Sequence, residues 1–326
     1  MARVLVTSRL VRETSDTAWR DLLTNAGHDV VMADIPADQL YFTEDQLKEQ
    51  LAGIAGTVAS SEPYTREVFH SAPELRAVSR VGVGYDAIDT QAAADHSVVA
   101  MIAAGSNDTT VAETAVGLIL ELARGLHTYF EATANGDWTR RLTGEVRGKT
   151  IGIVGLGRIG RSVVRRLVGF DPVLIAAEPF PDLGFVAEHG IELVELEDIF
   201  RRSDFITLHT LTTPQTANLV NRERLSLMKS TAFLVNTARG GLVDEDDLYD
   251  ALASNTIGGA ALDVQAKEPP EDHRLSQLPN VIATPHIAGI SYDCVGRMAE
   301  VAAQNVADVL EGSWQRQMVV NGIYSD

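Results

Sequence analysis

Four stretches of the sequence place polar side chains directly after short apolar runs. They are residues 209–212, 235–241, 261–270 and 283–289. Apolar runs of this length are typical of buried parallel strands, so each polar stretch is expected at the carboxyl end of a strand, where ligands bind in such sheets. For any one stretch a structural role is at least as good an explanation. The four together favour a functional site.

Three side chains in these stretches fit hydride transfer to a 2-keto acid, namely Arg239, Glu268 and His286. The planar guanidinium of an arginine holds a carboxylate through paired hydrogen bonds and polarises the adjacent carbonyl. A histidine titrates nearest neutral pH and suits the donor of a proton to the alkoxide as it forms. A carboxylate beside the histidine stabilises its protonated form. His209 also follows a predicted strand, and we interpret it as structural.

A glycine-rich turn lies upstream of these residues. Its glycines are Gly155, Gly157 and Gly160. They follow the β-branched run 151–154 and precede an amphipathic pattern over 161–167, and this combination suits the pyrophosphate of a dinucleotide. The next apolar run ends at Glu178, which is the spacing of an acid that binds the adenosine ribose. The alternative, an ordinary strand-to-helix turn without a ligand, is the weaker interpretation because the flanking strand, helix and acid are all present.

The first third of the chain alternates apolar runs with helical patterns. The runs cover residues 3–7, 29–32, 56–60 and 75–80. This alternation predicts a parallel sheet covered on both faces. Ser60 and residues 81–84 then follow strand ends, and Gly82 and Gly84 suit a loop whose main-chain N–H groups bind a carboxylate. A tight strand exit without a ligand explains these glycines equally well.

The rest of the chain repeats the same alternation. A long helix is expected over 111–126, capped by Thr109 or Thr110, and a second set of strands follows between residues 150 and 284. A last helix is expected over 293–311. The predicted fold class is therefore α/β, with two doubly wound, Rossmann-like parallel sheets and a cleft between them.

Composition excludes several classes of function. A net charge of −18 disfavours nucleic-acid binding, and no apolar run reaches the length of a membrane span. The single cysteine, Cys294, excludes an internal disulfide framework and favours a reducing, cytoplasmic location. Its expected role is helix packing. No metal site is predicted.

With these residues in view, the chain resembles the NAD-dependent D-2-hydroxyacid dehydrogenase family, and within it most of all the D-3-phosphoglycerate dehydrogenase branch. The resemblance runs nearly end to end. Its most specific segments are 80–89 (RVGVGYDAID), 148–160 (GKTIGIVGLGRIG), 236–244 (NTARGGLVD), 260–270 (AALDVQAKEPP) and 284–289 (TPHIAG).

The resemblance implies a role for each candidate residue. His286 would be the general acid/base, Glu268 its partner and Arg239 the substrate-binding arginine. The substrate carboxylate would also meet the N–H groups of Val83 and Gly84. The implied contacts to NAD are Gly155, Gly157, Arg158, Ile159, Gly160, Glu178, Thr210, Thr237, Ala238 and, toward the nicotinamide carboxamide, Asp263.

The resemblance also implies a domain layout. Residues 1–107 and 292–326 would form a flavodoxin-like substrate domain, and 108–291 the NAD-binding domain. The long helix would support a homodimer. Because the chain ends soon after its last helix, the regulatory serine-binding domain of many phosphoglycerate dehydrogenases is expected to be absent.

Two positions depart from the family's usual pattern. Glu178 stands where an aspartate is usual, but either acid repels a 2′-phosphate, so NAD is predicted over NADP. Ala115 stands where a threonine often contacts the cofactor.

The substrate is predicted to be 3-phosphoglycerate, because Arg80 and Arg140 fall where that branch places basic residues near the phosphate. Glyoxylate, hydroxypyruvate and other 2-keto acids are the competing substrates. Formate is disfavoured, since that branch carries glutamine at the position of Glu268. A different class, an NADH-sensing corepressor-like scaffold, is the remaining alternative.

Overall fold

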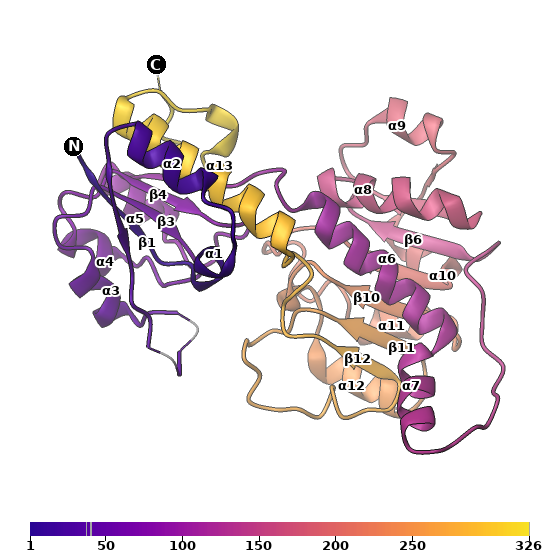
Figure 1. Ribbon diagram of the computed structural model, residues 1–326. Helices are drawn as coiled ribbons and strands as arrows, with labels where there is room; N and C mark the ends of the chain where they lie inside the picture. The colour runs from indigo at the N-terminus through magenta and orange to yellow at the C-terminus, as the bar shows by residue number, and fades with distance from the viewer. Residues whose placement is uncertain (37, 40, 326) are drawn as a thin grey trace. The chain divides into compact units, whose positions relative to one another are not determined.

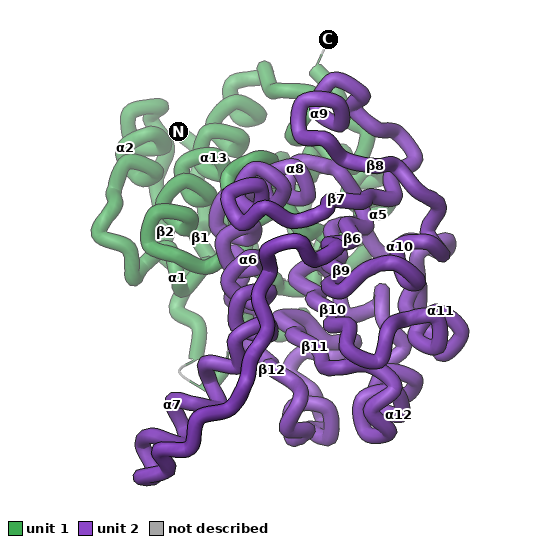
Figure 2. Tube along the Cα trace, turned by 90° about the vertical axis from the view of Figure 1, so that its right-hand side faces the viewer, with its two compact units in different colours: residues 1–107, 290–326 green, residues 108–289 purple. Residues whose placement is uncertain are grey.

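The computed structural model describes residues 1–36, 38–39 and 41–325 (Figure 1). Residues 37, 40 and 326, which fall in the predicted substrate domain, lie outside the described part. The chain divides into two compact units, which are coloured separately in Figure 2. Unit 1 comprises Met1–Asn107 and Ile290–Asp326, and unit 2 comprises Asp108–Gly289. Each unit contains a parallel sheet between helices, so the predicted α/β fold class is confirmed.

Unit 1 is built on a five-stranded parallel sheet in the order β2-β1-β3-β4-β5. Its strands are β1 (Arg3–Val6), β2 (Asp29–Met32), β3 (Gly56–Ala59), β4 (Ala77–Arg80) and β5 (Val99–Ile102). Its helices are α1 (Arg9–Glu13), α2 (Ala18–Asn25), α3 (Glu44–Gln50), α4 (Arg66–Ser71), α5 (Thr90–Asp95), α13 (Tyr292–Glu311) and the short η3 (Arg316–Met318). The chain turns to β2 on one side of β1 and to β3 on the other. The boundary between β1 and β3 is therefore the topological switch point of this sheet, where ligands bind in doubly wound folds.

The two faces of this sheet bury different clusters. In β1, Val4 and Val6 pack with α2 and α13, whereas Leu5 packs with the helices of the other face. Helix α13 lies directly on the backbone of β3, because a Cβ on Gly56 would come within 2.6 Å of Val306 Cγ1. Cys294 is buried in α13, as the packing interpretation expects.

Unit 2 is built on a seven-stranded parallel sheet in the order β12-β11-β10-β9-β6-β7-β8. Its strands are β6 (Thr150–Val154), β7 (Val173–Ala177), β8 (Glu192–Leu193), β9 (Phe205–Leu208), β10 (Phe233–Asn236), β11 (Gly259–Leu262) and β12 (Val281–Ala283). Its helices are α6 (Asp108–Arg124), α7 (Leu126–Ala134), α8 (Arg158–Leu167), η1 (Val168–Phe170), α9 (Leu183–Glu188), α10 (Leu196–Arg202), α11 (Arg222–Leu227), η2 (Gly240–Leu242) and α12 (Glu245–Ala253). The strand order reverses between β6 and β9, which makes that point the expected dinucleotide site.

The long helix differs from the sequence prediction at both ends. Helix α6 begins at Asp108, so Thr109 and Thr110 lie within its first turn and the predicted cap is wrong. The helix ends at Arg124 because Gly125 adopts a left-handed conformation with φ 56°, and α7 then begins at Leu126.

Candidate active site

The candidate catalytic residues of unit 2 lie on neighbouring loops. Strands β10, β11 and β12 are adjacent in the sheet, and Arg239, Asp263 and Thr284 follow their respective carboxyl ends. Glu268 lies further along the loop after β11, and His286 follows two residues after Thr284. Since parallel strands end at the same edge, these loops occupy one edge of the unit 2 sheet.

His286 and Glu268 form a close pair. His286 Nδ1 lies 2.6 Å from Glu268 Oε2, and the two side chains are 51% and 37% exposed. With Nδ1 engaged by the carboxylate, Nε2 is the ring nitrogen available to exchange a proton with a ligand. This arrangement is the carboxylate–imidazole pairing that supports general acid/base chemistry.

The carboxyl of Glu268 is held in its charged form. Burial alone would raise its pKa, but the hydrogen bond from His286, the N–H of Gln265 at 3.0 Å from Oε1, and the positive charges of His286 and Arg239 outweigh burial and lower the pKa. The Arg239 charge therefore acts on the same carboxylate that binds His286. Arg239, Glu268 and His286 form one electrostatic cluster within unit 2.

Arg239 is positioned by a buried asparagine. Asn236 Nδ2 donates to the carbonyl of Arg239 at 2.8 Å, and Asn236 Oδ1 accepts from the N–H of Ala238 at 3.0 Å. The next residue, Gly240, packs on the loop that leads to Glu268, because a Cβ there would lie 1.9 Å from the carbonyl carbon of Gln265. Glycine at this position lets the arginine loop and the glutamate loop touch through their backbones.

Asp263 organises the histidine loop. Its side chain is buried, and Oδ1 accepts from the Thr284 hydroxyl at 2.6 Å and from the Ile287 N–H at 2.8 Å. Oδ2 accepts from the Ala288 N–H at 2.8 Å. His286, between these residues, has a φ of 55°, which is uncommon for a non-glycine residue and typical of a functional position.

Sequence reasoning misses the supporting residues Asn236 and Thr284. Both lie inside the polar stretches described above. Thr284 binds Asp263, which is 21 residues away in the sequence, whereas Asn236 binds the backbone of its own turn. The available signal is a short polar side chain at the buried end of a strand, next to a candidate catalytic residue. The contact of Asp263 with the cofactor stays a prediction beside the positioning role that the structure shows.

The glycine turn has the space and the free donors that a pyrophosphate needs. A Cβ on Gly160 would lie 2.1 Å from the carbonyl oxygen of Gly155, and one on Gly155 would lie 2.6 Å from that of His209. At Gly157, by contrast, no described atom beyond its immediate neighbours comes within 4 Å of an added Cβ. No side chain in the described part of the chain caps α8 at Gly157, so its first N–H groups face this open space, together with Arg158 and Ile159.

Glu178 lies against the glycine turn. Its Oε2 accepts from the N–H of Leu156 at 2.8 Å, and its Oε1 accepts from the N–H of Phe180 at 3.0 Å. Arg158 is tied to the start of α6 by an ion pair of 2.8 Å with Asp108. The residues at this edge therefore fit a dinucleotide, with an acid placed where a ribose would lie and donors where the phosphates would lie.

Three further predicted cofactor residues follow β9 and β10. Thr210 and Ala238 are half-buried, and the Thr237 hydroxyl is buried without a hydrogen-bond partner among the described residues. A buried hydroxyl without a hydrogen bond lowers the stability of the fold unless a ligand forms that bond. The Thr237 hydroxyl therefore supports a ligand at this edge of the sheet. Neighbouring His209 is held by Thr207 at 2.9 Å, and burial lowers its pKa to about 4, in keeping with its structural interpretation.

Unit 1 holds the predicted carboxylate-binding loop. The loop 81–84 follows β4, and Gly82 has a φ of 149°, which disfavours a side chain there. Within the described residues, the N–H groups of Val83 and Gly84 donate no main-chain hydrogen bond, so both are available to an anion. Arg80 lies over this loop, with Nη1 donating to the Val81 carbonyl at 3.2 Å.

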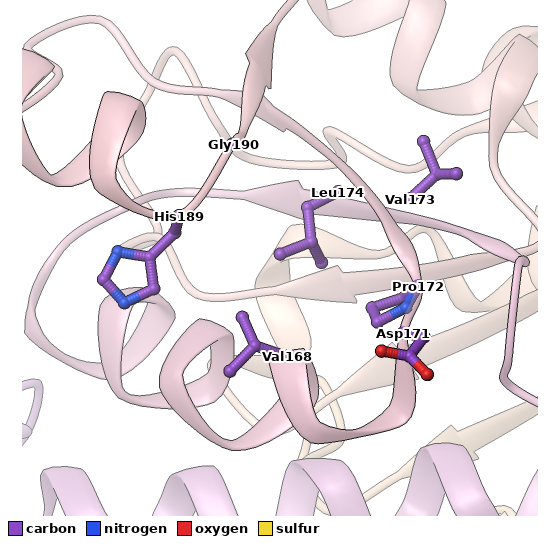
Figure 3. Close-up of a pocket in the computed structure, with 7 residues that line it drawn as sticks. All are labelled: Val168, Asp171, Pro172, Val173, Leu174, His189 and Gly190. Atoms are coloured by element: carbon purple, nitrogen blue, oxygen red, sulfur yellow. The ribbon is translucent and has the colours of Figure 1, made fainter.

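A pocket of about 410 Å³ lies elsewhere in unit 2 (Figure 3). Its lining residues are Val168, Asp171, Pro172, Val173, Leu174, His189 and Gly190. The pocket is at the amino end of β7, whereas Glu178 follows the carboxyl end of the same strand. Because ligands of doubly wound sheets bind at carboxyl ends, this pocket is not the cofactor site.

Among the described residues, every helix is too short or too polar to cross a bilayer.

Comparison with known proteins points in the same direction as the geometry. Residues 116–288 match the family model described as D-isomer specific 2-hydroxyacid dehydrogenase, NAD binding domain. The D-3-phosphoglycerate dehydrogenase of Methanocaldococcus jannaschii is 38% identical over 281 residues, which cover 85% of this chain and 54% of that protein. The human D-3-phosphoglycerate dehydrogenase is 34% identical, covering 93% of this chain and 56% of that protein. The chain thus spans about half the length of the curated relatives it matches.

Solved structures resemble the whole chain. A protein of Thermus thermophilus is 32% identical with a TM-score of 0.86, covering 98% of this chain and 99% of that one. The apo D-lactate dehydrogenase of Escherichia coli is 26% identical with a TM-score of 0.83, covering 98% of this chain and 100% of that one.

Proposed function

The chain belongs to the D-isomer-specific 2-hydroxyacid dehydrogenase family, and from that premise we propose that it transfers a hydride between NAD(H) and a D-2-hydroxy acid or its 2-keto acid. The observation that carries the proposal is the cluster of Arg239, Glu268 and His286 at one edge of the unit 2 sheet. A family match alone would allow a member that has lost its chemistry. The retained imidazole–carboxylate pair supports an active enzyme.

Each residue of the candidate site has a distinct proposed role in the reaction. When bound, the nicotinamide cofactor supplies or accepts the hydride at the substrate's second carbon. His286 delivers a proton from Nε2 to the carbonyl oxygen, and Glu268 stabilises the protonated ring through Nδ1. Arg239 binds the substrate carboxylate and polarises the carbonyl, while the N–H groups of Val83 and Gly84 hold the same carboxylate.

The cofactor is proposed to contact the glycine turn and the strand ends beside it. Gly155, Gly157 and Gly160, with the first turn of α8, hold the pyrophosphate, and Glu178 meets the adenosine ribose. Because a carboxylate repels a 2′-phosphate, NADH is the expected cofactor rather than NADPH.

Replacing Glu178 with alanine is expected to reduce the preference for NADH over NADPH. An unchanged ratio of the KM values for NADH and NADPH would place the ribose-binding acid elsewhere.

Two substrates remain candidates. 3-Phosphoglycerate is supported by the names of the curated relatives and by Arg80, which would face the phosphate. An unphosphorylated acid such as hydroxypyruvate or glyoxylate is the alternative, and it is supported by the likeness to the D-lactate dehydrogenase of Escherichia coli, whose named substrate carries no phosphate.

A kinetic panel tests the proposed function. The purified chain is assayed for NADH oxidation with phosphohydroxypyruvate, hydroxypyruvate, glyoxylate and longer 2-keto acids, and at least one acid is expected to give steady turnover. Tight NADH binding without turnover on any acid would reject the enzyme and favour an NADH-sensing scaffold.

We also propose that the chain binds a second copy of itself and forms a homodimer. None of the nine described side chains of α7 is buried, and Phe130 on this helix is 69% exposed. Trp138, just after the helix, is 80% exposed. Exposed aromatic residues grouped on one element are typical of an interface, and a homodimer covers them.

A further inference from the structure

The loop that carries Glu268 is joined to helix α12 on both sides of that residue. On the amino-terminal side, Glu245 Oε1 accepts from the main-chain N–H of Ala266 at 2.7 Å. On the carboxyl-terminal side, Arg274 forms an ion pair with Asp246. Glu245 and Asp246 are the first residues of α12. The start of this helix therefore holds the loop before and after its candidate catalytic carboxylate.

Glu245 is itself held in a fixed place. It begins α12, and the helix is capped by Asp244, whose side chain accepts from the N–H of Asp247 at 3.1 Å. One turn further on, Leu248 is fully buried in the core of unit 2. The Glu245 side chain is half-buried, and a short hydrogen bond to a carboxylate is roughly twice as strong as one between neutral groups. Glu245 can therefore act as an anchor for the loop.

A series of hydrogen bonds leads from Glu245 to the imidazole. The residue before Ala266 is Gln265, whose N–H donates to Oε1 of Glu268 at 3.0 Å. The other oxygen of Glu268, Oε2, lies 2.6 Å from Nδ1 of His286. Consecutive main-chain N–H groups thus bind two carboxylates, one from α12 and one from the candidate catalytic pair. A shift of the loop at Ala266 therefore also shifts the donor that holds Glu268.

We propose that Glu245 is a positioning residue for the pair of Glu268 and His286, which it holds in place through the main chain of the Glu268 loop. The inference rests on the proposed function, in which His286 donates a proton and Glu268 stabilises the protonated ring. The charges of His286 and Arg239 lower the pKa of Glu268. Glu245 acts instead on the position of the loop, and it touches neither the substrate nor the cofactor.

The test measures kcat against pH for a 2-keto acid that the parent protein reduces. Glu245→Ala removes the acceptor of the Ala266 N–H and is expected to lower kcat about tenfold. The alkaline limb of its kcat profile is expected to move to lower pH, because a displaced Glu268 stabilises the protonated His286 less. Glu245→Gln keeps an acceptor oxygen and is expected to restore most of the activity. The KM for NADH is expected to stay the same in both variants, since the glycine turn is a separate loop.

Glu223→Ala is the matched control. Glu223 also lies in the first turn of a helix of unit 2, α11, and it is exposed. The substitution removes the same charge from the same kind of position, so kcat and its pH profile are expected to match those of the parent. If Glu245→Ala does not fold, Glu245→Asp replaces it, because the shorter side chain withdraws the acceptor from Ala266 and keeps the charge.

A double variant shows whether Glu245 acts through Glu268. In the Glu268→Gln background, Glu245→Ala is expected to lower kcat less than about twofold, because the pair that it positions is already broken. An equal loss in both backgrounds overturns the inference. Parent-like kcat and pH profile in Glu245→Ala, or equal losses in the alanine and glutamine variants, also overturn it. Failure of the proposed function is distinct, because the parent protein then reduces no 2-keto acid.

Discussion

Asn236, Asp263 and Glu268 each fix a different part of the candidate site. Asn236 holds the backbone at Arg239, Asp263 holds the loop on both sides of His286, and Glu268 holds the imidazole itself. Polar side chains thus determine the positions of the reacting groups, and the contacts join residues from three separate strand ends. Single substitutions can separate chemistry from positioning.

Removal of the proton donor tests the chemistry. His286→Ala is expected to lower kcat for keto-acid reduction about 10²–10⁴-fold, the usual contribution of general acid catalysis. The Kd for NADH, measured by fluorescence, is expected to stay the same, because His286 is on a different loop from the glycine turn. A variant with kcat within about threefold of the parent would assign the proton to another group.

Removal of the anionic partner tests the pairing. The pKa of Glu268 is lowered, so its carboxylate stays charged throughout the neutral range and stabilises the protonated imidazole. In Glu268→Gln that stabilisation is lost, and the alkaline limb of the kcat profile for keto-acid reduction is expected to move to lower pH. Glu271→Gln, an exposed neighbour on the same loop, is the control. Superimposable profiles for parent and Glu268→Gln would exclude the pairing.

Removal of a positioning hydroxyl tests the histidine loop. Thr284→Val takes one of three donors from the Asp263 carboxylate and is expected to lower kcat more than it raises KM, since His286 is then held less firmly. Thr284→Ser keeps the hydroxyl and is expected to restore most of the activity. Equal rates for the valine and serine variants would show that the loop does not need this bond.

At the scale of elements, two positions of the glycine turn require glycine for different reasons, close packing at Gly160 and open space for a ligand at Gly157. The space around Gly160 is filled by the backbone of Gly155, whereas the space around Gly157 is open. The same small residue therefore serves packing at one position and access at the other. The sequence motif alone does not distinguish these demands.

This difference predicts two distinct variants. Gly160→Ala is expected to lower both Tm and NADH affinity, because its Cβ collides with main chain. Gly157→Ala is expected to leave Tm within about 1–2 °C of the parent and to weaken NADH binding, since its Cβ enters the space for the pyrophosphate. Thermal unfolding without cofactor and NADH titration measure the two effects. Unchanged NADH affinity in Gly157→Ala would move the cofactor away from this turn.

The elements themselves can largely be predicted from the sequence, because short apolar runs mark buried strands. The run 29–32 coincides with β2, and 151–154 lies within β6. Helix ends are harder to predict from the sequence. Helix α6 ends where Gly125 adopts a left-handed conformation, and no apolar pattern indicates that conformation. The contact between Asp263 and Thr284 joins residues 21 apart, so it emerges only when β11 and β12 are adjacent.

At the scale of the whole molecule, the chain carries an apolar surface that its own described residues leave exposed. Phe130, Trp138 and Leu142 lie on or just after α7, and none of them is covered. The net charge of −18 makes copies of the chain repel one another at long range but does not prevent association at a complementary patch.

Disruption of this surface tests the proposed homodimer. Phe130→Asp is expected to convert a dimer into a monomer, as measured by light scattering after size exclusion, because burying an unpaired charge at an apolar interface is strongly unfavourable. Thr128→Asp adds the same charge at an exposed polar position of α7, two residues from Phe130 and therefore on another face of the helix, and this control is expected to remain dimeric. A parent protein that is monomeric at micromolar concentration would reject the interface.

The two-part composition of unit 1 has a consequence for how the chain folds on the ribosome. Helix α13 supplies much of the core beneath β1, β3 and β4, yet it is made only after all of unit 2. At about 5–20 residues per second, the N-terminal sheet waits many seconds with one apolar face uncovered, while the later-made unit 2 can already close its own core. The part of this protein that is translated first is therefore completed last, and during that interval its bare face is where chaperones or aggregation would act.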